Sequence, residues 1–203
     1  MIRVIDYGLG NILAFLNVYK QLNVAAAAAR TPAELADADK LILPGVGAFD
    51  HAMQLLSASG MRPAVEQQVL ERQVPVLGVC VGMQILGVGS DEGREPGLGW
   101  IAAQVHGFEN LGQPQLRLPH MGWNDVVPAA ASPLFGGLES EPRFYFLHSY
   151  YVECERREDV AARASYGTDF ACAVSAGNIH GVQFHPEKSH HFGRRVLQNF
   201  AEL

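Results

Sequence analysis

The chain has 203 residues, of which 48% are hydrophobic and 18% are charged, and its formal net charge is −6 at pH 7. This length and composition predict a single globular domain, residues 1–203, and are unlike those of disordered chains. Because the charge is negative and no stretch gathers Lys and Arg into a stripe, we expect neither nucleic acid nor a membrane surface as a partner. Small molecules and other proteins remain as the expected partners.

The composition also predicts the cellular location and the absence of a metal. No apolar run reaches the roughly 18 residues that span a bilayer, and the first residues lack a signal peptide's apolar core, so we expect a cytoplasmic protein. The cysteines, Cys80, Cys154 and Cys172, have no paired spacing. We therefore expect reduced thiols, no disulfide or zinc framework, and no metal or cofactor.

Strands and helices alternate between residue 1 and Cys80. Apolar runs predict strands at residues 2–5, 24–29, 40–43 and before Cys80, while apolar periodicity and capping residues predict helices at 11–22, from Thr31, at 50–60 and at 63–72. This alternation predicts an α/β fold whose parallel sheet carries helices on both faces. Ligands of such sheets bind beyond the carboxyl ends of the strands, where Asp6, residues 44–47 and Cys80 lie.

The pattern changes after Gly97 to short segments with strand character. We expect these segments to form antiparallel extensions and the last strands of the sheet. They are residues 100–105, 115–118, 143–147, 151–154, 160–166, 170–175 and 179–184. Residues 189–203 then carry an apolar face with helical spacing, which predicts a C-terminal helix.

The stretch 75–84 is the strongest local indication of chemistry. Apolar residues lead to Gly78, Cys80 follows two residues later, and Gly82 precedes a helical pattern that extends to Val88. Glycines two residues on either side suit a sharp strand-to-helix turn, in which a Cβ would clash. A helix N-terminus also favours a thiolate. Cys80 is therefore a candidate nucleophile; a small buried hydrophobic residue is the alternative.

His185 and Glu187 supply a candidate base and its partner. Residues two apart in extended backbone project to the same side, so Glu187 can orient His185. Cys80, His185 and Glu187 together give a nucleophile, a base and an orienting group. His190 and His191 offer a metal site with His185 as an alternative, but no cysteine or carboxylate cluster accompanies them.

Acyl transfer also needs donors for the oxyanion. The N–H of Val81 follows the nucleophile, and Gly45, Val46 and Gly47 lie on a neighbouring loop with little side-chain obstruction. A plain glycine turn is the alternative for this loop.

Together these residues resemble the class I (triad) glutamine amidotransferases. The order of Cys80, His185 and Glu187 matches, and further motifs resemble the branch that forms glutaminase subunits in histidine biosynthesis. These motifs cover nearly the whole chain and are residues 6–11, 44–47, 78–84, 119–124, 144–150 and 185–189. The chain departs from the family at Val81, where leucine is frequent. Residues 90–93, 148–151 and 189–193 also resemble a paralogous branch that feeds the amidation of bacterial surface sugars.

The resemblance implies a flavodoxin-like fold and a reaction. Cys80 would attack the side-chain amide of L-glutamine, His185 would protonate the leaving ammonia, and water would release glutamate. The residues matching the substrate-binding positions of the family are Gly47, Gln84, Glu92 and Ser149. A carboxylate at Glu92 suits an α-ammonium group, although a solvated loop charge is the alternative.

The resemblance also implies a partner. In the family, ammonia passes to a (β/α)8 cyclase subunit, with which the chain would form a heterodimer. The matching interface positions are Asn11, Met121, Trp123 and Lys188. Three other functions stay open: the sugar-amidation paralogue, a self-sufficient cysteine hydrolase acting on γ-glutamyl substrates, and a non-catalytic binding module.

Overall fold

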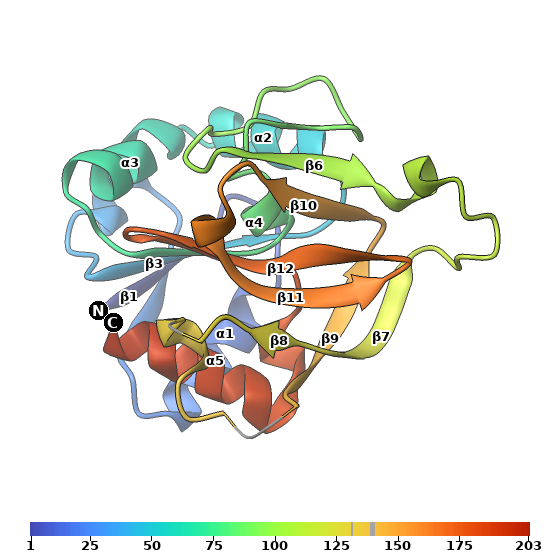
Figure 1. The fold of residues 1–203 in the computed structure, drawn as a ribbon. Helices are drawn as coiled ribbons and strands as arrows, with labels where there is room; N and C mark the ends of the chain where they lie inside the picture. The colour runs from blue at the N-terminus through green and yellow to red at the C-terminus, as the bar shows by residue number, and fades with distance from the viewer. Residues whose placement is uncertain (131, 139–140) are drawn as a thin grey trace.

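An 11-stranded sheet runs through the structure, a computed structural model that describes residues 1–130, 132–138 and 141–203 (Figure 1). Its strands are β1 (Ile2–Ile5), β2 (Ala26–Ala29), β3 (Lys40–Gly45), β4 (Val76–Cys80), β5 (Gly89–Ser90), β6 (Ala103–Gly107), β8 (Val127–Pro128), β10 (Tyr150–Cys154), β11 (Val160–Tyr166), β12 (Thr168–Ala176) and β13 (Ile179–Val182). The main order is β2-β1-β3-β4-β13-β12-β10-β6-β5, and β11 and β8 extend it beside β12. A second, two-stranded sheet pairs β7 (His120–Asp125) with β9 (Arg143–His148).

The strands from β2 to β13 in that order pair in parallel, as the alternating sequence predicts. Strand β4 is buried along its whole length between β3 and β13, which explains its unbroken apolar run. The remaining neighbours are antiparallel except for β5 and β6. The predicted fold, a mostly parallel sheet with antiparallel extensions, is therefore confirmed.

Helices cover both faces of this sheet. They are α1 (Ile12–Gln21), α2 (Phe49–Ala58), α3 (Arg62–Glu66), α4 (Val81–Gln84) and α5 (His190–Glu202). Figure 1 shows α2 and α3 on one face and α1 and α5 on the other. Helix α5 buries Val196, Leu197 and Phe200 and leaves its charged side outward, which confirms the predicted C-terminal helix.

Four local predictions were wrong. Residues 143–147 do not extend the main sheet but form β9 of the second, two-stranded sheet. Residues 115–118 form no strand but a turn, because Pro114 and Pro119 bracket them and lack the N–H that a strand ladder needs. Residues 63–72 are not one α-helix: α3 gives way to a π-helix at Gln67–Glu71. The helix after Cys80 has only 4 residues, since Val88 leaves it to donate its N–H to Ala103 O.

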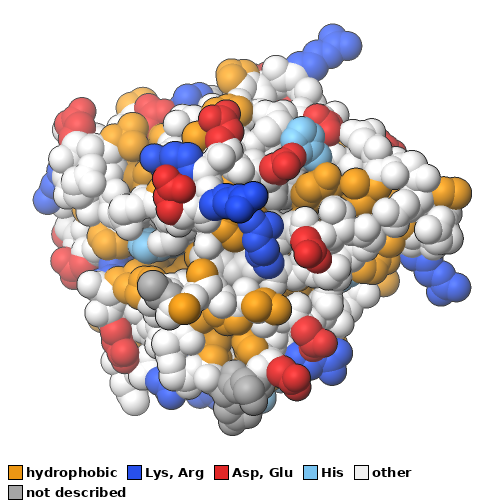
Figure 2. Space-filling view, in the orientation of Figure 1, with side chains coloured by type: hydrophobic (Ala, Val, Ile, Leu, Met, Phe, Trp, Pro, Cys, Tyr) orange, Lys and Arg blue, Asp and Glu red, His pale blue; other side chains and the backbone are white. Residues whose placement is uncertain are grey.

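The surface carries charges of both signs. On the face shown in Figure 2, Lys and Arg side chains alternate with Asp and Glu and form no continuous basic stripe. Over the described parts of the chain, no helix combines the length and the apolar character that crossing a membrane requires.

Candidate active site

Cys80 ends β4 at a sharp backbone turn. Its backbone angles, φ of 56° and ψ of −116°, lie in a region that residues other than glycine rarely adopt. A Cβ at Gly78 would meet the Gly82 backbone, and a Cβ at Gly82 would overlap the carbonyl of Leu43 on β3. The two glycines are therefore required because the backbones of β3, β4 and α4 touch here, and this contact turns Cys80 to the carboxyl edge of the sheet.

His185 and Glu187 follow β13, the neighbour of β4. Glu187 Oε1 lies 2.9 Å from His185 Nδ1, and both side chains are nearly buried. Ser189 Oγ donates to His185 O over 2.6 Å and accepts from Tyr145 N over 3.0 Å, which fixes the backbone of the histidine. The predicted pairing of His185 with Glu187 is present.

The electrostatics of His185 favour its protonated form. Burial alone would lower the pKa of His185, but its interactions with Cys80 and Glu187 outweigh burial and raise the pKa to about 9. At neutral pH the ring is therefore an imidazolium, with the Glu187 carboxylate and the Cys80 sulfur as its neighbours. A protonated ring in this position can supply the proton for a leaving group.

A cavity of about 290 Å³ opens over the nucleophile. Most of the predicted site residues line it: Val46, Gly47, Cys80, Val81, Gln84, Glu92, Ser149, His185 and Lys188. Pro119, Leu147, His148 and Tyr150 complete the lining. Glu187 lies behind His185, as an orienting group should.

Gly45 is the one predicted oxyanion residue that the structure does not bring to the cavity wall. It is buried in β3, pairs with Cys80, and an added Cβ would overlap Gly82 N. Its small size therefore serves the close packing of β3 against the turn. Gly47, by contrast, has a φ of +86° and open space around its Cβ position, so it belongs to the loop above the sulfur.

Hydrogen bonds fix the side chains of two lining residues, Gln84 and Glu92. Gln84 Nε2 donates to Tyr150 O over 3.3 Å and to Gln183 Oε1 over 3.0 Å. Glu92 Oε2 accepts from Phe49 N, at the start of α2, over 2.8 Å. Because these partners use the Gln84 amide hydrogens, its carboxamide oxygen is the atom that remains for a ligand.

The four predicted interface residues lie around this region but outside the cavity, except for Lys188. Asn11 caps α1, where its Oδ1 accepts from Ala14 N. Met121 and Trp123 project from alternate positions of β7 and are 65% and 41% exposed. Lys188 Nζ lies 5.9 Å from the centre of the Tyr145 ring.

The sequence analysis missed several site residues. Gln183 is fully buried, and its Nε2 lies 3.8 Å from Cys80 Sγ. His120 and His148 form a buried pair, with Nδ1 of His120 2.8 Å from Nε2 of His148. No local pattern singles out these three residues, because their partners lie far away in the sequence.

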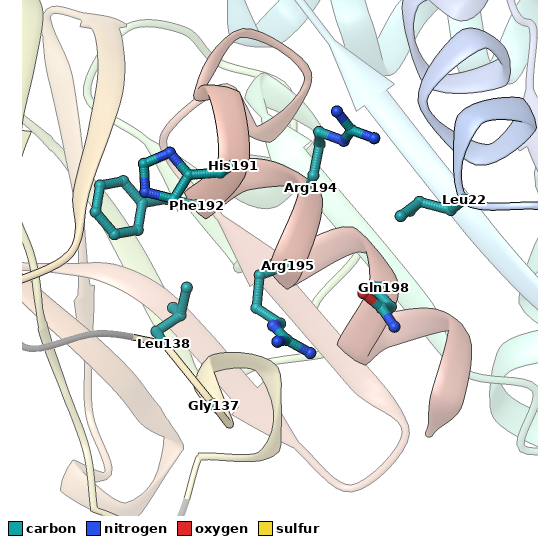
Figure 3. A pocket seen from close by; sticks show the side chains of 8 residues that line it. All are labelled: Leu22, Gly137, Leu138, His191, Phe192, Arg194, Arg195 and Gln198. Carbon is teal, nitrogen blue, oxygen red and sulfur yellow. The ribbon is translucent and has the colours of Figure 1, made fainter.

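A second hollow, of about 330 Å³, lies along α5 and shares no lining residue with this cavity (Figure 3). Arg194 and Arg195 line it, but Figure 3 shows their guanidinium groups pointing apart, so they do not converge on one ligand. His191 also lies there. Within residues 1–130, 132–138 and 141–203, no three His, Cys, Asp or Glu side chains gather as a metal-binding group.

Comparison with solved structures places this fold among amidotransferases. A crystal structure of a glutamine amidotransferase matches with a TM-score of 0.76 and 21% identity, over 100% of this chain and 99% of that one. A glutamine amidotransferase from Thermotoga maritima matches with a TM-score of 0.63 and 17% identity, over 99% and 82% of the two chains. At these identities the likeness shows the fold alone.

Sequence comparison then shows the family. The model of the class-I glutamine amidotransferase family matches residues 3–203, and the chain belongs to this family. It is 56% identical to imidazole glycerol phosphate synthase subunit HisH of Bdellovibrio bacteriovorus and 52% identical to that of Leptospira interrogans, over 100% of each chain. It is 47% identical to subunit HisH 2 of Pseudomonas aeruginosa, again over 100% of each chain.

Proposed function

We propose that this chain is the glutaminase subunit of an imidazole glycerol phosphate synthase. It hydrolyses L-glutamine to glutamate and ammonia, and the ammonia passes to a (β/α)8 cyclase subunit. That subunit makes imidazole glycerol phosphate and aminoimidazole carboxamide ribonucleotide in histidine biosynthesis. The observation that carries this proposal is that Cys80 and His185 line one cavity and Glu187 pairs with the histidine, in a chain whose full-length relatives are named as this subunit.

The three side chains divide the reaction among them. The Cys80 thiolate attacks the side-chain carbonyl carbon of glutamine and forms a tetrahedral intermediate. His185 then gives its proton to the departing nitrogen, so that ammonia leaves and a thioester remains. A water molecule gives a proton back to His185 as it attacks the thioester, and glutamate departs from the regenerated sulfur. Glu187 stabilises the imidazolium throughout.

Backbone donors and polar walls complete the site. The N–H of Val81, together with the loop that carries Val46 and Gly47, stabilises the oxyanion of each tetrahedral intermediate. Gln84, Glu92 and the backbone at Ser149 hold the amino-acid end of glutamine. This placement is supported by the hydrogen bonds that fix Gln84 and Glu92 at the cavity wall.

The cyclase subunit docks over the mouth of the cavity as the partner in a heterodimer. The interface contains Asn11, Met121, Trp123 and Lys188. Exposed apolar side chains support this placement: Leu147 lines the cavity and pairs with Met121 across β7 and β9, and Trp123 follows on the same side of β7. Apolar side chains exposed together around a site are typical of protein interfaces.

Two further proposals concern the domain organisation and the cellular location of the chain. We propose that residues 1–203 form one domain, because the main sheet joins strands from both ends of the chain. We propose a cytoplasmic location, which the free thiols of Cys80, Cys154 and Cys172 support.

The test is glutamate release from L-glutamine by the purified chain, alone and with the histidine-pathway cyclase subunit of the same genome and its nucleotide substrate. We expect strong stimulation in the complete mixture. Cys80→Ala should abolish release without weakening the complex, whereas the matched variant Cys154→Ala should leave the rate unchanged. Activity only with a paralogous cyclase would overturn the pathway, and fast turnover by the lone chain would indicate a self-sufficient hydrolase.

A further inference from the structure

Gln183 lies against the nucleophile and belongs to none of the groups described so far for the reaction. It follows β13, between that strand and His185, and is fully buried. Its Nε2 is 3.8 Å from Cys80 Sγ, within the range of an N–H donor to sulfur. An N–H directed at a thiolate stabilises the charged form, as a charge-assisted hydrogen bond does elsewhere.

The orientation of the Gln183 carboxamide follows from a hydrogen-bond chain that starts at the Tyr150 carbonyl, which can only accept. The carbonyl of Tyr150 has no hydrogen, so the Gln84 carboxamide must turn its NH₂ group toward it. The same NH₂ group donates to Gln183 over 3.0 Å, so Gln183 must present its oxygen there. The NH₂ group of Gln183 is then left facing the Cys80 sulfur.

A pair of buried histidines anchors that carbonyl. His148 Nδ1 lies 2.8 Å from Tyr150 O, and a carbonyl can only accept, so this nitrogen carries the hydrogen. His148 Nε2 must then accept from Nδ1 of His120, 2.8 Å away. The other nitrogen of His120 in turn faces the NH₂ group of Asn124, at 3.3 Å, on β7. Each donor in the chain has one possible direction.

The surroundings keep both histidines neutral, as these directions require. Burial lowers the pKa of His120 to about 4 and that of His148 to about 3. His120 is stacked between the rings of Tyr166 and Phe146, whose centroids lie 4.0 and 4.9 Å away. A neutral, stacked ring holds one tautomer and one orientation.

We propose that Gln183 is a further catalytic residue, which donates its carboxamide N–H to the Cys80 thiolate. Gln84, His148 and His120 are positioning residues that hold this donor in place. The inference rests on the proposed function because it assigns a stabilising group to the same nucleophile. It also links the thiolate to β7, the strand that carries two of the predicted interface residues.

The test is the rate at which iodoacetamide alkylates Cys80 in the isolated full chain at about pH 7. This reaction needs neither glutamine nor a partner and reports on the thiolate. Gln183→Met keeps the volume but removes the donor, and we expect alkylation of Cys80 to slow about tenfold. Glutamine hydrolysis by the complex should lose a similar factor in kcat with KM nearly unchanged. Cys154 serves as the internal standard, because its alkylation should not change.

A second variant of Gln183 replaces Gln183→Met if that protein does not fold. In Gln183→Glu the carboxylate still accepts from Gln84 but presents an acceptor to the sulfur, so the same slowing of alkylation is expected.

Two variants of His148 separate positioning from packing. His148→Asn keeps an N–H near the position of Nδ1, whereas His148→Phe keeps only the ring. We expect the Asn variant to retain most of the alkylation rate and the Phe variant to lose it.

The outcomes are distinct. A folded Gln183→Met or Gln183→Glu chain that is alkylated at the wild-type rate would overturn the inference and leave the proposed function standing. Equal rates for His148→Asn and His148→Phe would overturn the positioning role. Slowed alkylation in the variants, with no glutamine hydrolysis by the wild-type complex, would support the inference while the proposed function fails.

Discussion

Two histidines, His185 and His148, line the same cavity, and one is charged while the other is neutral. On one side, His185 has a pKa raised to about 9; on the other, the pKa of His148 is lowered to about 3. Both rings are almost completely buried. Burial lowers the pKa of both rings, so the raised value at His185 must come from its partners.

The partners of the two rings explain the difference. His185 faces a carboxylate, Glu187, and the Cys80 sulfur, both of which favour the imidazolium. The pKa of His148 is lowered by burial, and of its two neighbours only the Tyr150 carbonyl acts to raise the pKa, which does not offset burial, while His120 lowers it further. A buried histidine can serve as an acid and base when it contacts anionic partners. When it contacts only neutral partners, it stays neutral and orients its neighbours.

Removing the carboxylate should make His185 resemble His148, and this change has the largest expected effect. Glu187→Gln is isosteric, and Oε2 of Glu187 has no hydrogen-bond partner within the described residues, so the amide breaks no bond. We expect the pKa of His185 to fall and glutamate release by the complex to drop roughly 10³-fold or more. Steady-state kinetics measure this, and an unchanged rate would remove Glu187 from the mechanism.

Low pH should destabilise the folded protein through its buried, neutral histidines. The folded pKa values of His148 and His180, about 3 and about 4, lie below the unfolded value of 6.5. Their contribution to stability is therefore complete above the unfolded pKa and is lost as the pH falls toward the folded values. At about pH 5 each should cost on the order of 2 kcal/mol.

Urea unfolding near pH 7 and pH 5 checks this loss of stability. The variant His180→Gln should show a smaller difference between the two pH values than the wild type, because one titrating group is gone. His180 does not line the cavity, and its Nδ1 lies 2.8 Å from Ser175 Oγ, so the variant should keep its glutaminase activity. An equal pH difference in both proteins would contradict the assignment.

The backbone anchor of His185 has a smaller expected effect. Ser189→Ala removes an acceptor from the Tyr145 N–H and a donor to the His185 carbonyl. Because Ser189 is fully buried, we expect a loss of about 1–3 kcal/mol in unfolding free energy. Ser59 makes a similar pair of backbone bonds on the surface, so Ser59→Ala is the matched control and should lose less. Similar losses in urea unfolding would show that burial is unimportant here.

A substitution in the hollow of Figure 3 should have the smallest effect on activity. Arg195→Ala alters a wall that holds neither the nucleophile nor its base. We expect glutamate release by the complex to stay within about twofold of the wild type. A larger loss would mean that α5 takes part in catalysis or in partner binding.

The sequence predicted the parallel half of the fold because local pattern and burial agree there. The apolar run before Cys80 is buried on both faces, and Asn11 caps α1 where the turn was expected. The length of the helix after Cys80 was not predictable, because it ends where Val88 bonds to the distant Ala103. Tertiary contacts overrode the periodic pattern at that point.

The site was predictable to the same extent. Cys80, His185 and Glu187 could be proposed because each lies within a short motif, and the structure brings Cys80 and His185 to one cavity and pairs His185 with Glu187. Gly45 was expected at the oxyanion because it was placed on the loop after a neighbouring strand, with little side-chain obstruction, but it lies within β3, where contact with Gly82 requires a glycine. Gln183 was missed because its partners, Cys80 and Gln84, are 103 and 99 positions away.

The central claim is that the two histidine groups differ in charge because of their partners. Nitrogen-15 NMR of the histidine rings at about pH 7 tests it most directly, with signals assigned through His185→Gln and His148→Asn. We expect both nitrogens of His185 to be protonated, and those of His148 to show a neutral ring with the hydrogen on Nδ1. A neutral His185, or a protonated His148, would contradict the account.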